Sequence, residues 1–385
     1  MISAWLPRLS VAALLGLAVS GCAAGSARLD AAAEAADPDA MSTLQDAFAD
    51  AFLMGVALNE RQFRGEDARA RPIVESQFNS ATPENQMKWM YIHPEPGVYD
   101  FDASDAFVDY AEANDMFIVG HTLVWHSQTP RWVFEDESGA PLTREALLAR
   151  MEDHITTVVG RYRGRIHGWD VVNEALNEDG TLRDSPWRRI IGDDYIEHAF
   201  RFAHAADPDA ELYYNDYSLE NKPKRDGAVR LVRTAQEAGA RVTGIGTQGH
   251  FHMTEPTLAQ IDSTIQAFAE LGTVMITELE IDVLPSRGSM SADVGRREEG
   301  GAGLDPYTEG LPDDVQQALA DRYAELFRLF LDHQDDITRV TFWGVTDGDS
   351  WKNGFPIPGR TNHPLLFDRD GAPKPAFQSV IRTAD

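Results

Sequence analysis

Short apolar runs rich in β-branched and aromatic residues recur along the chain, and each ends in polar or aromatic residues. Runs of this length and composition predict buried strands. In chain order the eight runs are Phe52–Asn59, Phe78–Asn85, Phe117–His126, Ile166–Glu174, Glu211–Tyr217, Val242–His250, Thr273–Asp282 and Val340–Asp347.

The stretches between these runs carry apolar residues at helical spacing, most clearly in residues 147–158 and 315–330. The second of these helices is expected to have Pro312 at its first position, with Asp313 and Asp314 in the first turn, where the helix dipole favours acidic groups. Strand and helix alternating eight times predict an α/β fold, a single (β/α)8 TIM barrel over residues 42–385.

Unusual polar and aromatic residues lie late in the predicted strands. Active sites of (β/α)8 barrels lie at the carboxyl ends of the strands, so we expect these residues to meet in one site. They include Glu84, Asn85, His121, Trp125, His126, Asn173, Glu174, Asn215, Asp216, Tyr217, Gln248, His250, Glu278, Glu280, Trp343 and Asp347.

Two of these residues, Glu174 and Glu278, are the candidates for acid/base and nucleophilic chemistry on a glycosidic bond, which requires a pair of carboxyl groups. Glu278 would remain ionised, helped by hydrogen bonds from donors such as His250, whereas the negative charge of Glu278 would raise the pKa of Glu174. Asn173 and Glu174 are adjacent, so both can face the site only if the strand bends or ends between them. The alternative for each glutamate is an ordinary salt-bridged or solvated carboxylate.

The histidines allow a second interpretation. His121 with His126, or His250 with His252, could bind a metal ion in a metallohydrolase, although hydrogen bonding to carboxylates and sugar hydroxyls is favoured here. We therefore expect neither a metal nor another cofactor. Four tryptophans, namely Trp89, Trp125, Trp343 and Trp351, suit a cleft in which rings stack on sugars.

Four motifs together resemble glycoside hydrolase family 10, the endo-1,4-β-xylanases. They are Thr82–Trp89, His121–Gln128, Trp169–Ala175 and Ile276–Glu280, and the resemblance extends from Ala47 to Ile381. It implies a retaining endo-hydrolase of β-1,4-xylosidic links in xylan, with Glu174 as acid/base and Glu278 as nucleophile.

The resemblance also implies roles for the surrounding residues. Sugar-binding residues would be Glu84, Asn85, Lys88, His121, Trp125, Gln128, Asn173, Tyr217, Gln248, His250, Trp343 and Trp351, with His126 and Glu280 behind them. The family usually has Asp where this chain has Glu280, which leaves open whether the longer side chain still contacts His250. Residues 285–311 are expected to form a mobile loop on the leaving-group side of the cleft.

Other activities remain open from the sequence. A β-1,4-glucanase or a mixed xylanase/cellulase would use the same chemistry, and a glycan-binding lipoprotein would have the same barrel without turnover. The formal net charge of −28 argues against nucleic acid as a partner. Xylan or xylo-oligosaccharides are the expected partners, and we expect a monomer.

The first residues predict an exported protein. Arg8 precedes an apolar run, Val11–Val19, that is too short to span a bilayer, and Val19–Cys22 resembles a bacterial lipobox. We expect a signal peptide over residues 1–21, lipidation of Cys22 and a flexible tether over residues 22–41. The protein would then be anchored to the cell envelope, at the outer membrane; without lipidation it would be secreted. Cys22 is the one cysteine, which excludes disulfides within the chain.

Overall fold

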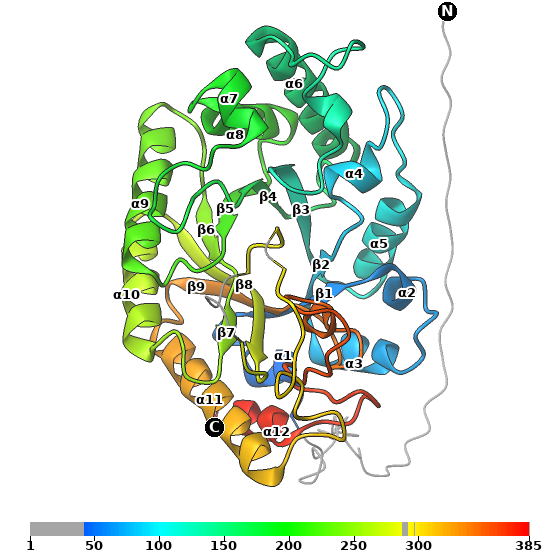
Figure 1. Cartoon of the computed structure of the whole chain (residues 1–385), viewed down its shortest axis with the longest axis vertical. Helices are drawn as coiled ribbons and strands as arrows, with labels where there is room; N and C mark the ends of the chain where they lie inside the picture. The colour runs from blue at the N-terminus through cyan, green and yellow to red at the C-terminus, as the bar shows by residue number, and fades with distance from the viewer. Residues whose placement is uncertain (1–41, 287–291, 296, 385) are drawn as a thin grey trace, which may run out of the picture. The chain divides into compact units, whose positions relative to one another are not determined.

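Eight parallel strands close into a barrel surrounded by helices in this computed structural model, which describes residues 42–286, 292–295 and 297–384 (Figure 1). Each strand pairs with its neighbour in chain order, and β6 (Gly244–Thr247) closes the circle by pairing with β8 (Thr273–Asp282), while β9 (Ile337–Phe342) pairs with β1 (Leu53–Leu58). One additional short strand, β7 (His250–His252), pairs only with the end of β8. The predicted (β/α)8 barrel is therefore confirmed.

All eight predicted strands are present, and the sixth is divided in two. The strands are β1 (Leu53–Leu58), β2 (Ser80–Pro83), β3 (Phe117–Trp125), β4 (Gly168–Asn173), β5 (Glu211–Asp216), β6 (Gly244–Thr247), β7 (His250–His252), β8 (Thr273–Asp282) and β9 (Ile337–Phe342). The division falls at Gly249, whose φ of 83° is incompatible with a regular strand. The last strand begins earlier than predicted and ends before Trp343.

The helices lie around the barrel, and the longest agree with the predicted patterns. They are α1 (Leu44–Ala47), α2 (Glu60–Phe63), α3 (Ala70–Gln77), α4 (Trp89–Ile92), α5 (Asp102–Ala113), α6 (Arg144–Arg161), α7 (Pro186–Ile191), α8 (Tyr195–Ala206), α9 (Lys222–Glu237), α10 (Leu258–Ala269), α11 (Asp313–Asp332) and α12 (Pro375–Ile381), with 3-10 turns at Arg131–Val133 and Trp351–Asn353. Pro312 was predicted inside α11 but is the N-cap residue, because its ψ of 152° is extended.

Helix α6 shows how the sequence produces these helices. The side chain of Thr143 accepts a hydrogen bond from the backbone of Ala146 and so caps the first turn. Leu147, Met151 and Ile155 recur on one face of the helix and are completely buried. Burial of this face against the barrel therefore stabilises the helix more than its intrinsic propensity does.

The amino-terminal end of the barrel interior is filled. Val119, Tyr213 and Met275 form a small buried cluster of their own, and the partly buried Phe117 packs against it. The guanidinium of Arg339 lies over the rings of Phe117 and Tyr213, at 5.5 and 5.4 Å from their centres. Side chains thus fill this part of the barrel interior, and active sites of (β/α)8 barrels lie at the opposite, carboxyl ends of the strands.

Register shifts in the strands aim side chains into the open end. Thr247 pairs with Ile276 of β8, and His250 pairs with Glu280. Between these two pairs the sixth strand has three steps along the chain, whereas β8 has four. On its other side, β8 pairs with β9 at Ile276 and again at Leu279. Between these two pairs β8 has three steps along the chain, whereas β9 has two. The extra residue in β8 forms a bulge at residues 277–278, and bulges of this kind turn side chains toward a site.

Glycines at the sheet allow the strands and rings to approach each other closely. A side-chain carbon on Gly120 would lie 2.1 Å from the ring of Trp169, and one on Gly246 would lie 2.5 Å from Asn215 Oδ1. These glycines therefore serve packing.

Some predictions concern residues outside the described ranges, namely the signal peptide (1–21), the lipidation site Cys22 and the tether (22–41). The described residues belong to one compact unit that begins at Ser42. Within them, no helix is both long and apolar enough to cross a membrane. The predicted loop 285–311 is described except for residues 287–291 and 296.

Candidate active site

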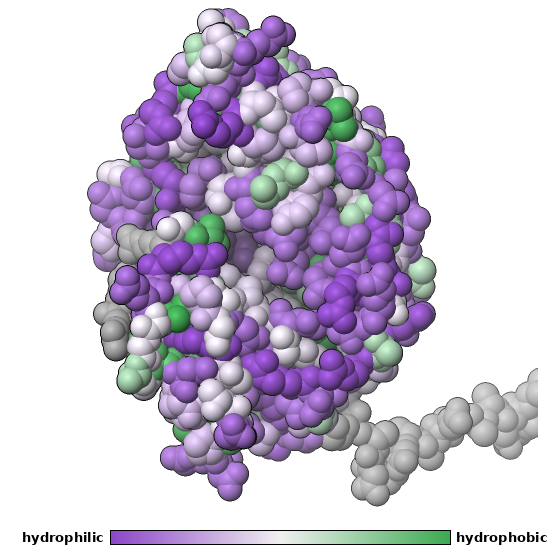
Figure 2. Space-filling view, turned by 45° about the vertical axis from the view of Figure 1, so that its right-hand side comes forward, coloured by the Kyte–Doolittle hydropathy of each residue, from purple (hydrophilic) through white to green (hydrophobic). Residues whose placement is uncertain are grey.

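A cavity of about 140 Å³ lies at the carboxyl ends of the strands. Figure 2 shows a largely hydrophilic surface that is hollowed near the centre of the face in view. The lining residues are Glu84, Asn85, Lys88, His121, Trp125, Gln128, Asn173, Glu174, Gln248, His250, Glu278, Ala292, Val294, Trp343 and Trp351.

Glu174 follows the last residue of β4 and has a φ of 55°, so the strand ends between Asn173 and Glu174. This is the bend that the two adjacent residues required, and both side chains line the cavity. A positive φ is unfavourable for glutamate, and hydrogen bonds hold the backbone in place. The backbone N–H of Glu174 donates to the carbonyl of Asn215 at 2.8 Å, and Arg183 Nε donates to the carbonyl of Glu174 at 3.2 Å.

The carboxyl group of Glu174 is bound at both oxygens. Trp125 Nε1 donates to Oε2 at 2.8 Å, and Gln248 Nε2 donates to Oε1 at 3.1 Å. Burial, followed by the negative charge of Asp216, raises the pKa of Glu174 to about 7. The raised pKa was predicted, and the charge of Glu278 contributes to it as predicted, but less than burial and the charge of Asp216 do.

Glu278 has the opposite electrostatic setting. Asn215 Nδ2 donates to Oε1 at 2.9 Å, and His250 Nε2 lies 3.2 Å from Oε2. Burial alone would raise the pKa of Glu278, but the hydrogen bond and the positive charge of His250 outweigh burial and hold the pKa below its ordinary value. Glu278 is therefore ionised at neutral pH.

His250 lies between two carboxylates. Its Nδ1 lies 2.8 Å from Glu280 Oε1, and its Nε2 faces Glu278. Both nitrogens must carry protons in order to donate, which requires the imidazolium form. Burial alone would lower the pKa of His250, but hydrogen bonds to Glu278 and Glu280 outweigh burial and raise it.

Glu280 contacts His250 even though its side chain is longer than that of the aspartate usual in the family. The same oxygen, Oε1, that faces His250 also accepts a hydrogen bond from Trp351 Nε1 at 2.6 Å. Trp351 is itself a wall of the cavity. Glu280 therefore connects the histidine beside Glu278 to an aromatic wall.

Side-chain amides connect Glu174 and Glu278. Asn173 Oδ1 accepts hydrogen bonds from Asn215 Nδ2 at 3.0 Å and from Gln248 Nε2 at 3.5 Å. Thr277 Oγ1 donates to Asn215 Oδ1 at 2.7 Å, which fixes the orientation of that amide. Asn173 is thus left with its NH₂ group to offer a ligand. Sequence reasoning noted Asn215 at a strand end but assigned it no role.

On the β2 side of the cavity, Lys88 Nζ donates to Asn85 Oδ1 at 3.0 Å and lies 5.1 Å from the ring centre of Trp125. Burial lowers the pKa of Lys88 and raises that of Glu84. These groups can exchange hydrogen bonds with sugar hydroxyls once a ligand displaces water.

His121 is oriented by a residue that sequence reasoning missed. Its Nδ1 lies 2.9 Å from Oδ2 of the buried Asp170, one residue after Trp169 on β4. This contact leaves Nε2 for the cavity. In the described part of the chain, no three His, Cys, Asp or Glu side chains are clustered so that they could hold a metal ion.

Two aromatic predictions need correction. Tyr217 is absent from the cavity lining, and its hydroxyl accepts a hydrogen bond from Arg183 Nη2 at 2.8 Å. His126, which was expected behind the sugar-binding residues, is also absent from the lining, and burial lowers its pKa to about 3. Trp89 was expected in the cleft but lies in the core, where its ring stacks on His154 at 3.6 Å. It is the first residue of α4, and the helix directs its side chain inward.

Known proteins are similar to this chain in sequence and fold. The family model for Glycosyl hydrolase family 10 matches residues 43–383. Endo-1,4-beta-xylanase A of Xylanibacter ruminicola is 44% identical over 342 residues, which cover 88% of this chain and 93% of that protein. Beta-1,4-xylanase of Dictyoglomus thermophilum is 40% identical over 343 residues, which cover 88% of this chain and 90% of that protein.

Solved structures are equally similar. An endoxylanase of this family, retrieved from a sugarcane soil metagenome, has a TM-score of 0.86 at 44% identity, over 88% of this chain and 99% of that chain. Xylanase XynB from Paenibacillus barcinonensis, complexed with a conduramine derivative, has a TM-score of 0.81 at 39% identity. The match covers 89% of this chain and 99% of that chain.

Proposed function

Because this chain belongs to Glycosyl hydrolase family 10, we propose that it hydrolyses β-1,4-xylosidic bonds within xylan, with net retention at the anomeric carbon. The observation that carries the mechanism is the pair of buried carboxyl groups on one cavity, whose pKa values are displaced in opposite directions. Such a pair separates the acid role from the nucleophile role.

In the first step the ionised Glu278 attacks the anomeric carbon while Glu174 gives its proton to the departing glycosidic oxygen. The leaving chain departs with a new hydroxyl group, and the sugar remains as an ester on Glu278. In the second step Glu174, now ionised, takes a proton from water, whose oxygen attacks the same carbon and releases Glu278. Two inversions give net retention.

The surrounding groups support these steps. Asn215 and His250 hold the Glu278 carboxylate ionised and fixed in orientation. Trp125 and Gln248 hold the acid group of Glu174, and the NH₂ group of Asn173 is available to a sugar hydroxyl. The rings of Trp343 and Trp351 offer apolar faces for stacking on the sugar.

Proton NMR of the first products from linear xylohexaose tests the stereochemistry. Retention predicts that the β-anomer forms first and then mutarotates. An initial α-anomer would contradict the proposed nucleophile, and release of xylose alone from the chain ends would contradict internal cleavage. The relatives described above are named xylanases, so the glucanase and glycan-binding alternatives gain no support from them.

We further propose that the protein is exported and anchored through lipid on Cys22, in keeping with the lipobox-like Val19–Cys22 and the lack of any other cysteine. Envelope fractions of expressing cells should retain the full chain, and Cys22→Ala should move xylanase activity to the soluble fraction. Equal distribution of both proteins would contradict the anchor. Light scattering of the soluble variant tests the expected monomer.

A further inference from the structure

The loop that follows β4 folds back on the residue from which it starts. Leu176 and Leu182 form an isolated antiparallel bridge, which closes residues 177–181 into a short turn. This turn returns the chain to Glu174, so that Arg183 lies beside a residue nine positions earlier in the sequence. Arg183 therefore joins the end of the loop to its beginning.

Arg183 donates hydrogen bonds to three successive carbonyl groups. Its Nε donates to the carbonyl of Glu174 at 3.2 Å, its backbone N–H donates to that of Ala175 at 2.7 Å, and its Nη2 donates to that of Leu176 at 3.4 Å. The guanidinium can serve several acceptors at once because its five N–H groups lie in one rigid plane. One residue thus fixes the backbone of Glu174 and of the two residues that follow it.

The guanidinium of Arg183 is itself fixed by two other segments of the chain. Its Nη2 also donates to the hydroxyl of Tyr217, the residue after β5, at 2.8 Å. Its Nη1 lies 3.2 Å from Oδ2 of Asp293, in an ion pair whose side chains are only 16% and 18% exposed. Partly buried pairs of this kind are less screened by salt than surface pairs, so the guanidinium has a defined orientation.

The backbone of Glu174 needs such support. Its φ of 55° is unfavourable for glutamate and persists only where the surroundings hold it. The carboxyl group must also stay between Trp125 Nε1 and Gln248 Nε2, which lie on separate strands of the barrel or directly after them. A rotation of the backbone at Glu174 would move the carboxyl group away from both donors. A displacement of about 1 Å at a reacting group can cost about 10²-fold in rate.

Building on the proposed function, we propose that Arg183 is a positioning residue for the general acid: its hydrogen bonds keep the backbone of Glu174 in the conformation that presents the proton to the departing glycosidic oxygen. Arg183 does not line the catalytic cavity, which agrees with an action through Glu174. Its removal should therefore slow the steps in which Glu174 transfers a proton and spare a step that needs no proton.

The dependence on the leaving group tests this role. The parameter kcat/KM covers the reaction up to the ester on Glu278, and this stage needs the proton of Glu174 when a sugar departs but not when dinitrophenolate departs. Arg183→Met should lower kcat/KM about 10- to 10²-fold on linear xylohexaose and less than about threefold on dinitrophenyl xylobioside. Steady-state kinetics on the two substrates measures both values.

A double variant separates action through Glu174 from direct contact with the sugar. Once Glu174 is alanine, Arg183 has no carboxyl group left to position. Adding Arg183→Met to Glu174→Ala should therefore change kcat/KM on xylohexaose by less than about twofold, because residues that act as a unit are not additive. A residue that binds the sugar directly would instead cause a further loss of the same size as in the wild type.

Two further variants serve as controls. Arg183→Lys keeps the positive charge opposite Asp293, but an ammonium cannot replace the planar guanidinium, so it should show the same leaving-group dependence as Arg183→Met. It also provides the test if Arg183→Met does not fold. Arg189→Met removes an exposed arginine from α7, the helix that follows the loop, and should retain wild-type kinetics. Thermal unfolding identifies the variants that are folded.

Three results would overturn the positioning role. They are equal losses on the two substrates, which would mean a general disturbance of the site; additive losses in the double variant; and wild-type kinetics in Arg183→Lys, which would mean that charge alone suffices. No turnover of linear xylohexaose by the wild type would instead overturn the proposed function itself.

Discussion

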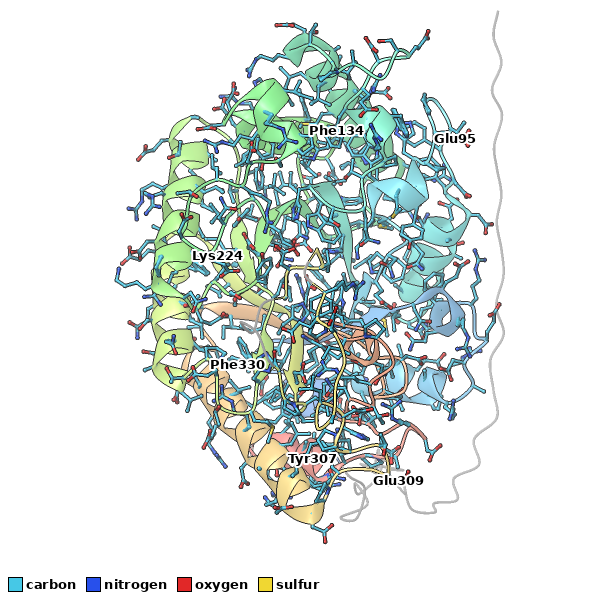
Figure 3. All side chains as sticks on the ribbon, viewed as in Figure 1. Glu95, Phe134, Lys224, Tyr307, Glu309 and Phe330 are labelled. Carbon is cyan, nitrogen blue, oxygen red and sulfur yellow. The ribbon has the colours of Figure 1, made fainter. Side chains whose placement is uncertain are left out.

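Lys224 Nζ lies 3.0 Å from Oδ1 of Asp216, and neither side chain has any exposure to solvent. Lys224 lies on the side of α9 that faces the barrel (Figure 3), with its ammonium 3.3 Å from the ring centre of Tyr217. Asp216 Oδ2 also accepts the backbone N–H of Leu176, two residues beyond Glu174, at 3.3 Å. The pair thus lies directly behind the acid/base residue.

This pair should set the alkaline limit of activity. Glu174 must be protonated in the first step, and after burial the charge of Asp216 is the second cause of its pKa of about 7. Other charged or titratable groups also face Glu174, namely Glu278, Lys88, Arg183 and Tyr217. Their effect on the pKa of Glu174 is the same in the wild type and in variants of the pair. Asp216→Asn should move the alkaline limb of kcat/KM to lower pH, and Lys224→Met should move it to higher pH.

Stability provides a check on the same pair. Removing one partner leaves a buried charge uncompensated and typically costs about 3–5 kcal/mol of unfolding free energy. Asp216→Asn combined with Lys224→Met should recover much of this loss. If both single variants move the alkaline limb in the same direction, the electrostatic explanation is wrong.

The two glutamates should differ in how they depend on the leaving group. Glu278→Ala should abolish turnover of every substrate while sugar binding persists. Glu174→Ala should lower kcat on xylan about 10²–10⁴-fold, the usual contribution of a general acid, and much less on aryl xylobiosides whose phenol departs without a proton. Steady-state kinetics on both substrates measures this, and equal losses would contradict the acid/base role.

Glu280 should influence the acidic limit of activity. Its charge stabilises protonated His250, which in turn keeps Glu278 ionised. Glu280→Gln should therefore lower the pKa of His250, raise that of Glu278 and move the acidic limb of kcat/KM to higher pH. Trp351→Phe, which removes only the indole donor to Glu280, should raise KM more than it moves this limb. An unmoved acidic limb in Glu280→Gln would refute the connection.

A buried histidine pair that does not line the catalytic cavity should make the protein acid-sensitive. His93 Nδ1 and His154 Nδ1 lie 3.3 Å apart, stacked with Trp89. Burial lowers the pKa of His93 to about 4 and holds the pKa of His154 well below its ordinary value. Below the ordinary histidine pKa of about 6.5 the unfolded chain binds protons that the folded chain cannot. The unfolding free energy should fall as the pH drops from about 6.5 toward 4.

Urea unfolding at pH 7 and pH 5 measures this effect. His154→Gln, which cannot be protonated, should lose less stability between the two values than the wild type does. Equal losses would mean that other groups cause the acid sensitivity.

The sequence alone determined the barrel and its chemistry. Strand runs such as Phe117–His126 and helices such as residues 144–161 follow from local periodicity, because a buried face must recur with the period of its own element. Glu174 and Glu278 were identified because parallel strands place their carboxyl ends on one rim. The adjacency of Asn173 and Glu174 even required the bend found at Glu174.

Only the tertiary structure decided which groups touch. It placed Asn215 between the two halves of the site, buried Trp89, moved Tyr217 off the cavity wall and brought Ala292 and Val294 onto it. It also made burial and Asp216 the main causes of the raised pKa of Glu174. Periodicity records the direction of a side chain within its own element, whereas electrostatics and cavity shape depend on distances across space between residues remote in the chain.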